Sequence, residues 1–144
     1  MFQLSVCAGT VLQDLPFLDR VREIARAGFL VDLWGWEDDA LETIASDANI
    51  TIGAIPGWSR GSMVHPDGVE TYFEGVRRSL EVADQLGCRN LAIGTGEIGS
   101  DMRVVHSIAS HPATFWITAY KCLCRLAELA ESHDVTFSFE IMNT

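Results

Sequence analysis

The chain has 144 residues, of which 48% are apolar, and its mean hydropathy is +0.16, which together suit a domain with a hydrophobic core rather than a disordered chain. Its formal net charge of −10 disfavours binding to nucleic-acid phosphates and to anionic membranes, and it is compatible with ordinary cytoplasmic solubility. No apolar run is long enough to span a bilayer, and the first residues lack the basic start of a signal peptide.

Strand and helix patterns alternate along the first part of the chain. Pro16 suits the first turn of a helix and Gly28 suits its end. Asp38 or Asp39 can cap the second helix. The predicted strands are Gln3–Ala8, Phe29–Trp34 and Ile50–Ile55, and the predicted helices are Pro16–Ala27 and about Asp39–Asn49.

The alternation continues to the end of the sequence. Gly87 is expected to stop the third helix. The fourth helix is expected to turn Phe115, Trp116, Ala119, Leu123, Leu126 and Ala130 inward. The predicted elements are a loop at Trp58–Pro66, a helix at Asp67–Leu86, a strand at Asn90–Gly94, a loop at Thr95–Ser110, a helix at Pro112–Ser132 and a strand from Val135 onward.

The four cysteines are expected to be free thiols buried in the core of a protein from a reducing compartment. Two of them fall two positions apart on the fourth predicted helix, where side chains point in different directions, so they form a poor metal or redox pair. The cysteines are Cys7, Cys88, Cys122 and Cys124.

The element order predicts a single α/β domain, residues 1–144, with a parallel sheet and right-handed crossovers. Two architectures compete: an open doubly wound sheet and a parallel (β/α) barrel of the TIM type. The predicted strands alternate, with one aliphatic face and one small or polar face, which favours a barrel wall over a strand covered by helices on both sides. The aliphatic residues are Leu4, Val6 and Ala8, then Val31 and Leu33, then Leu91 and Ile93, and finally Val135, Phe137, Phe139 and Ile141.

About five strands and four helices make a partial barrel, because a complete one has eight strands. We therefore expect residues 1–144 to be the N-terminal part of a (β/α)8 barrel. Completion by a missing C-terminal half is the first possibility, and association of copies into a homo-oligomer is the second.

Candidate functional residues follow the ends of the strands, where barrel enzymes place their chemistry. Glu140 is a lone carboxylate near the end of the last strand and is the candidate catalytic and metal-binding residue. Candidate substrate-binding residues are Trp34, His65, Thr95 and Glu97.

Three segments carry a family resemblance: Ala27–Trp36, Leu86–Cys88 and the ending Phe139–Thr144, which reads Phe-Glu-Ile-Met-Asn-Thr. In order and spacing they resemble the xylose-isomerase-like TIM-barrel superfamily, and most closely its hydroxypyruvate isomerase-like branch. The resemblance implies a divalent metal, Mg²⁺ or Mn²⁺, at the C-terminal ends of the strands, with Glu140 as its first ligand. Asp32 stands where relatives often carry glutamate, which leaves its role open.

The resemblance implies a metal-dependent isomerase of small sugars or hydroxy-keto acids, which moves a proton between adjacent carbons. A related epimerase or dehydratase on the same scaffold is the alternative among enzymes. From a different class, the chain could be a catalytically inactive half-barrel that serves as an assembly module. The abasic-site endonucleases of the superfamily are disfavoured by the net charge of −10.

Overall fold

A single curved sheet forms the centre of the molecule. The computed structural model describes residues 3–96, 99, 103, 105 and 113–140. Its five strands are all parallel and follow one another in chain order. A doubly wound sheet reverses its strand order at a switch point, whereas a barrel does not, so the order confirms a partial TIM-type barrel. The strands are β1 Ser5–Cys7, β2 Leu30–Asp32, β3 Ile52–Pro56, β4 Asn90–Ile93 and β5 Thr136–Phe139.

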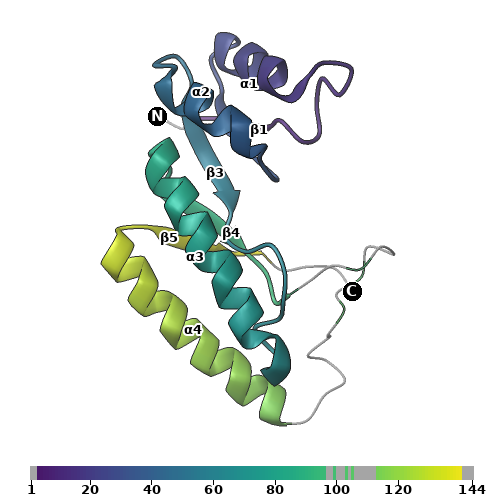
Figure 1. Cartoon of the computed structure of the whole chain (residues 1–144), viewed down its shortest axis with the longest axis vertical. Helices are drawn as coiled ribbons and strands as arrows, with labels where there is room; N and C mark the ends of the chain where they lie inside the picture. Colours follow the sequence, from purple (N-terminus) through teal and green to yellow (C-terminus); the bar gives the residue numbers. More distant parts are fainter. Residues whose placement is uncertain (1–2, 97–98, 100–102, 104, 106–112, 141–144) are drawn as a thin grey trace.

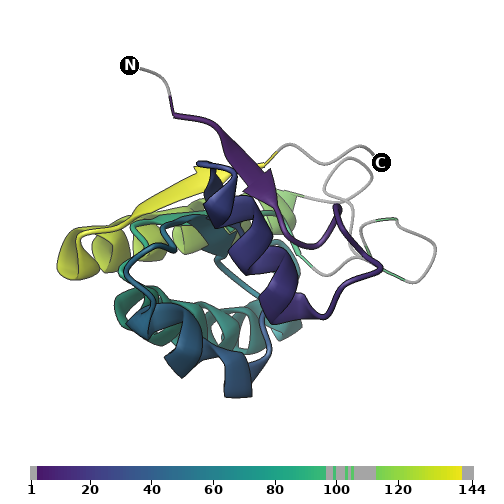
Figure 2. The ribbon, with the colours of Figure 1, turned by 90° about the horizontal axis from the view of Figure 1, so that it is seen from above.

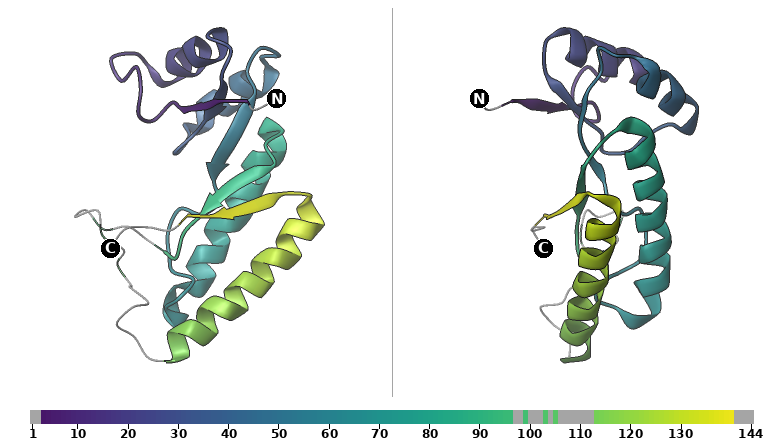
Figure 3. Two further views of the ribbon diagram at one scale, coloured as in Figure 1. Left: turned by 180° about the vertical axis from the view of Figure 1, so that it is seen from behind. Right: turned by 90° about the vertical axis from the view of Figure 1, so that its left-hand side faces the viewer.

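The helices lie along one side of this sheet, as the view from above shows (Figure 2). The two longest helices run side by side against one face of β4 and β5, in front of these strands in Figure 1 and behind them in the left view of Figure 3. Among the residues that the model describes, no helix combines the length and apolarity needed to cross a membrane. The helices are α1 Phe17–Arg26, η1 Asp38–Ala40 with α2 Leu41–Ser46, η2 Pro66–Gly68 with α3 Val69–Leu86, and α4 Ala113–His133.

The core fills the space between the sheet and the helices. Val31 and Leu91 of the sheet are fully buried, and so are Tyr72 and Phe73 of α3. Val21 and Ile24 of α1 are buried, and their spacing places them on one face of the helix. The aliphatic faces of the inner strands β2 and β4 are therefore buried in this core.

The prediction for the inward face of α4 is wrong at two positions. Trp116 and Leu123 are 61% and 45% exposed, whereas Phe115, Cys122 and Leu126 are buried. Apolar residues occur on more than one side of this helix, so their spacing alone does not fix which side meets the sheet. The contact with α3 fixes the orientation of α4, because Arg125 donates to Glu70 and lies over the ring of Phe73. At about 100° per residue, Trp116 lies on the opposite side of the helix from Arg125.

The expected burial of the aliphatic face also fails at both ends of the sheet. Leu4 is 68% exposed and Phe139 is 47% exposed. β1 and β5 each have one neighbouring strand in the described sheet, so no further helix covers their outer sides.

The expectation of buried cysteines holds for two of the four. Cys88 and Cys122 are buried, and burial raises the pKa of both thiols. Cys124 is exposed because it lies two positions from Cys122 on the same helix, and Cys7 is half-buried at the inner face of the sheet.

Gly61 and Gly28 offer a matched test of the loop that follows β3. Both have a positive φ, +81° and +86°, but a Cβ at Gly61 would lie 2.5 Å from the backbone nitrogen of Tyr72, whereas nothing lies within 4 Å of one at Gly28. Gly28→Ala should cost about 1 kcal/mol of unfolding free energy through its backbone conformation alone. Gly61→Ala should cost roughly 3 kcal/mol, since the backbone clash is added. If urea denaturation gave the two variants equal losses of unfolding free energy, the packing of this loop against α3 would be contradicted.

Candidate functional site

A hollow of about 670 Å³ lies on the face of the sheet opposite the helices. The polar or small face of each strand supplies its floor, as the alternation predicts. Aromatic residues that follow β2 and β3 supply its walls. The floor residues are Cys7, Asp32, Ala54, Pro56, Ala92 and Glu140, and the wall residues include Trp34, Trp36, Trp58 and Ser59.

Glu140 stands at the end of β5 and lines the hollow. Its backbone N–H donates to the carbonyl oxygen of Ile93 at 2.8 Å, which continues the pairing of β4 with β5 past the end of the strand. Glu140 is exposed to solvent. A hydrogen bond thus ties the backbone of Glu140 to the sheet, and the exposed carboxylate of Glu140 can contact a ligand.

Asp32, the last residue of β2, is a second carboxylate in the hollow. Its Oδ1 is buried and has no hydrogen-bond partner among the atoms that the model describes. Gly53 makes room for it, because a Cβ there would lie 2.7 Å from Asp32 Oδ1 and 2.8 Å from Ser5 Oγ. A buried carboxylate oxygen without a donor costs free energy, so this oxygen lowers the stability of the strand pair at Gly53.

Three of the four tryptophans of the chain line the hollow. Trp34 is 64% exposed, and Trp36 and Trp58 are half-buried. The ring of Trp58 stacks on Tyr72 of α3, with 6.3 Å between centroids. Tyr72 is itself fixed, because its hydroxyl donates to the carbonyl oxygen of Gly94 at 3.0 Å. The Trp58 wall is therefore supported from the core.

Removing the Tyr72 hydroxyl should weaken the fold in a pH-dependent way. Burial raises the pKa of Tyr72 above its ordinary value, because the neutral phenol is favoured in the core. The folded state therefore keeps its full stability while the pH is below the unfolded-state pKa of about 10. As the pH rises above that value, the unfolded chain loses the phenol proton more readily than the folded one, and the free energy of unfolding falls. Tyr72→Phe should lower the unfolding free energy by about 1 kcal/mol at pH 8.

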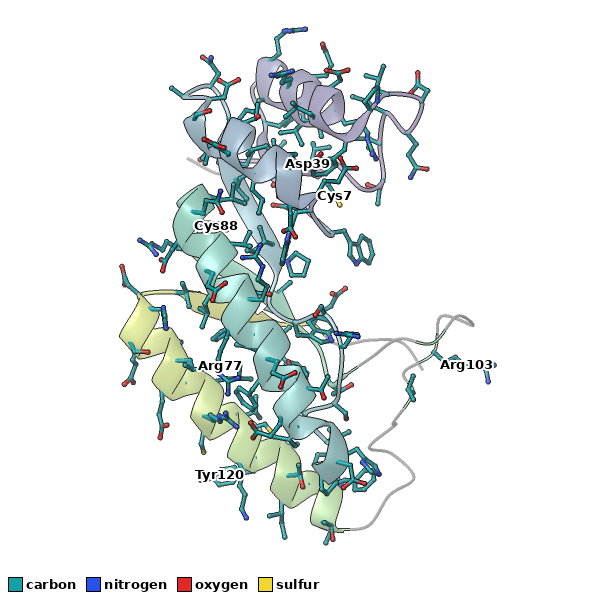
Figure 4. All side chains as sticks on the ribbon, in the orientation of Figure 1. Cys7, Asp39, Arg77, Cys88, Arg103 and Tyr120 are labelled. Carbon is teal, nitrogen blue, oxygen red and sulfur yellow. The ribbon has the colours of Figure 1, made fainter. Side chains whose placement is uncertain are left out.

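Urea denaturation at pH 8 and at a pH above 10 tests this expectation. The loss of stability on going to the higher pH should be smaller in Tyr72→Phe than in the wild-type chain. Tyr120→Phe is the comparison for an exposed phenol on α4 (Figure 4), because the contact with Cys124, and not mainly burial, raises the pKa of Tyr120. Its effect on the alkaline loss should be the smaller of the two. An unchanged alkaline loss in Tyr72→Phe would show that this phenol does not titrate on unfolding.

Two other candidate substrate-binding residues are not among the residues that line the hollow. His65 precedes η2, is half-buried, and packs edge-on against Phe115 with 5.2 Å between ring centroids. The carbonyl oxygen of Thr95 accepts a bond from the N–H of Met63 at 3.0 Å. Neither residue is in the lining, and Glu97 lies outside the described residues. Their roles in substrate binding stay predictions.

The sequence alone did not single out Trp58, Ser59 or Cys7. A signal was present for Trp58, which follows the Pro56-Gly57 end of the third strand and so comes from the catalytic end of a barrel. Cys7 alternates with Val6 and Ala8 of the first strand, and the period of two places it on the face that lines the hollow.

A divalent metal is not held by these residues alone. In the described part of the chain, no three His, Cys, Asp or Glu side chains gather as a metal site. Mg²⁺ and Mn²⁺ require several oxygen ligands, and Glu140 offers one carboxylate.

Solved structures share this fold. An AP endonuclease, family 2, from Brucella melitensis superposes with a TM-score of 0.81 at 22% identity, over 100% of this chain and 57% of that one. A D-tagatose 3-epimerase-like protein gives a TM-score of 0.73 at 12% identity, over 99% and 54%. A fusion of a xylose isomerase-like TIM barrel with a 4-hydroxyphenylpyruvate dioxygenase gives 0.68 at 14%, over 96% and 21%.

Identities this low establish the fold and nothing finer. The chain spans a little over half the length of the first two structures, so it corresponds to part of a TIM-type barrel. No family model and no curated protein matches the sequence.

Proposed function

We propose that the hollow is part of the active site of an isomerase or epimerase of small sugars or hydroxy-keto acids. The observation that carries the proposal is a carboxylate, Glu140, on a backbone tied to the sheet at the C-terminal end of a barrel strand. Barrel enzymes place their catalytic groups at these strand ends. The likeness to a D-tagatose 3-epimerase-like protein supports sugar chemistry on this scaffold.

In this proposal Glu140 moves a proton at the carbon next to the substrate carbonyl. As a carboxylate it removes the proton, and as a carboxylic acid it returns the proton to the neighbouring carbon on the same face, which isomerises the substrate. Epimerisation at the same carbon would require a second acid on the opposite face of the enediol, supplied by a group outside the described lining of the hollow. Asp32 and the tryptophans hold the substrate against the sheet.

A divalent cation, Mg²⁺ or Mn²⁺, is part of the proposal, with Glu140 as one ligand. When bound, it would polarise the substrate oxygens. The remaining ligands must come from groups other than the described cluster, because that cluster does not form a metal site by itself. We propose that further βα units, from a longer polypeptide or from a second copy, cover the open edges at β1 and β5.

The endonuclease activity named for the Brucella melitensis structure is not part of the proposal. The net charge of this chain is −10, and the described lining of the hollow contains no lysine or arginine. Binding to a phosphate backbone rests on such cationic groups.

An NMR assay of sugar interconversion tests the proposal. The chain, and any longer polypeptide that contains it, should convert at least one small ketose or hydroxy-keto acid into its isomer or epimer when Mn²⁺ is present. Chelation of the metal should abolish the conversion. Activity of the longer polypeptide alone would mean that the second wall is essential. No activity in either would favour the inactive assembly module.

A further inference from the structure

The outer side of α4 carries an apolar strip that no described element covers. The side of the helix that faces the core is marked by its buried residues, which are Phe115, Cys122 and Leu126. At about 100° per residue, Ile117, Tyr120 and Cys124 lie within about 40° of the opposite direction. Ile117 is 54% exposed, Tyr120 is 68% exposed, and Cys124, which contacts Tyr120, is exposed as well. These side chains form the centre of the outer strip of α4 (Figure 4).

A further helix of the same barrel cannot cover this strip. The helices of a barrel form one layer around the sheet, so the neighbours of α4 lie at its flanks. One flank meets α3 through Arg125. Trp116 and Leu123 lie on the other flank, where a neighbouring helix can cover them, and they are therefore not counted in the strip. The strip points away from the barrel, so a partner for it must come from outside the barrel.

The sequence of the strip suits a second α4 in the opposite direction. Its positions recur at intervals of four and three residues, the spacing at which two helices pack along each other. They are Ala113, Ile117, Tyr120, Cys124, Ala127 and Glu131, with Glu128 beside the last. An antiparallel copy brings the acidic end of each helix to the N-terminal end of the other, where the helix dipole favours carboxylates. A parallel copy would set the glutamates of the two helices side by side.

We propose that the outer strip of α4 docks on the same strip of a second copy of this chain. The two helices lie antiparallel about a twofold axis near Tyr120, as a self-complementary interface requires. Ile117 of each copy then packs against Cys124 of the second copy, a large residue against a small one. The hollow lies on the face of the sheet opposite the helices and stays open, so the proposal does not depend on the proposed function.

The size and charge of the interface predict a weak dimer that salt strengthens. A standard interface buries about 800 Å² on each partner, and this strip is smaller, so we expect a dissociation constant of roughly 10–100 µM. Each copy carries a net charge of −10, and added salt screens the repulsion between the two copies. Analytical ultracentrifugation of the 144-residue chain over a range of concentrations measures this equilibrium at low and at high salt.

Two exposed apolar residues provide a matched pair of variants. Tyr120→Asp should raise the dissociation constant at least about tenfold, because it sets two carboxylates near the axis. Leu4 is also 68% exposed but lies beside β1 at the open edge of the sheet, so Leu4→Asp should leave the constant unchanged. A dimer that Leu4→Asp abolishes and Tyr120→Asp preserves would overturn the proposal.

Ile117→Cys tests the direction of the two helices. Under mild oxidation this variant should form a covalent dimer through Cys124 of the second copy, whereas the wild-type chain should not. Positions 117 and 124 of one helix are about 10 Å apart, too far for a disulfide within one copy. Adding Cys124→Ser should abolish the covalent dimer, and a covalent dimer that persists would overturn the antiparallel arrangement. A chain that stays monomeric at every concentration and salt would overturn the proposal as a whole.

Discussion

Glu140→Gln should lower turnover of the active protein by about 10²–10⁴-fold, the range typical of a lost general acid–base group. Glutamine keeps the size of the side chain but can neither take up nor release the proton. The backbone bond from residue 140 to Ile93 does not involve the side chain, so the fold should be unaffected. Steady-state kinetics together with a thermal melt measure the two quantities.

Glu131→Gln is the matched control for this substitution. Glu131 is exposed on α4 and is not part of the lining of the hollow, so its neutralisation should leave turnover unchanged. A Glu140→Gln protein with full activity would show that Glu140 is a solvated residue at a strand end and that the catalytic group lies elsewhere.

Phe73→Ala should cost about 3–5 kcal/mol of unfolding free energy, as expected for a large aromatic residue in a core. The Phe73 ring is fully buried, meets Tyr72 edge-on at 5.8 Å between centroids, and has the Arg125 guanidinium 3.8 Å from its centroid. Its removal leaves a cavity where α3 meets α4. The ion pair of Arg125 with Glu70 is largely exposed and compensates little.

Phe139→Ala is the comparison for Phe73→Ala. Phe139 lies on the edge strand and is 47% exposed, so its loss should cost clearly less than that of Phe73. Urea denaturation of both variants measures the difference. Equal losses would mean that a covering element buries Phe139 in solution, and they would contradict the edge position of β5.

The main features of the fold are predictable from the sequence because strand alternation is a local signal. The two faces of β2 and β4 follow from Val31, Asp32 and Leu91 read at a period of two, and the place of Glu140 follows from the same rule applied to β5. Gly87 ends α3 with φ +64°, as its sequence position predicts.

The features that escape prediction depend on contacts between distant residues. The orientation of α4 is set by Arg125 against Phe73, and the position of His65 is set by Phe115. The buried oxygen of Asp32 depends on Gly53, where the register between β2 and β3 shifts. None of these relations leaves a periodic pattern in the sequence.

Deuterium incorporation from D₂O shows whether Glu140 exchanges a substrate proton in the hollow. NMR of the recovered sugar should show deuterium at the carbon next to the carbonyl after incubation with the wild-type protein and with Glu131→Gln. Glu140→Gln should give no incorporation above the rate without protein. Turnover without deuterium incorporation, or incorporation by Glu140→Gln at the wild-type rate, would show that Glu140 does not transfer the proton.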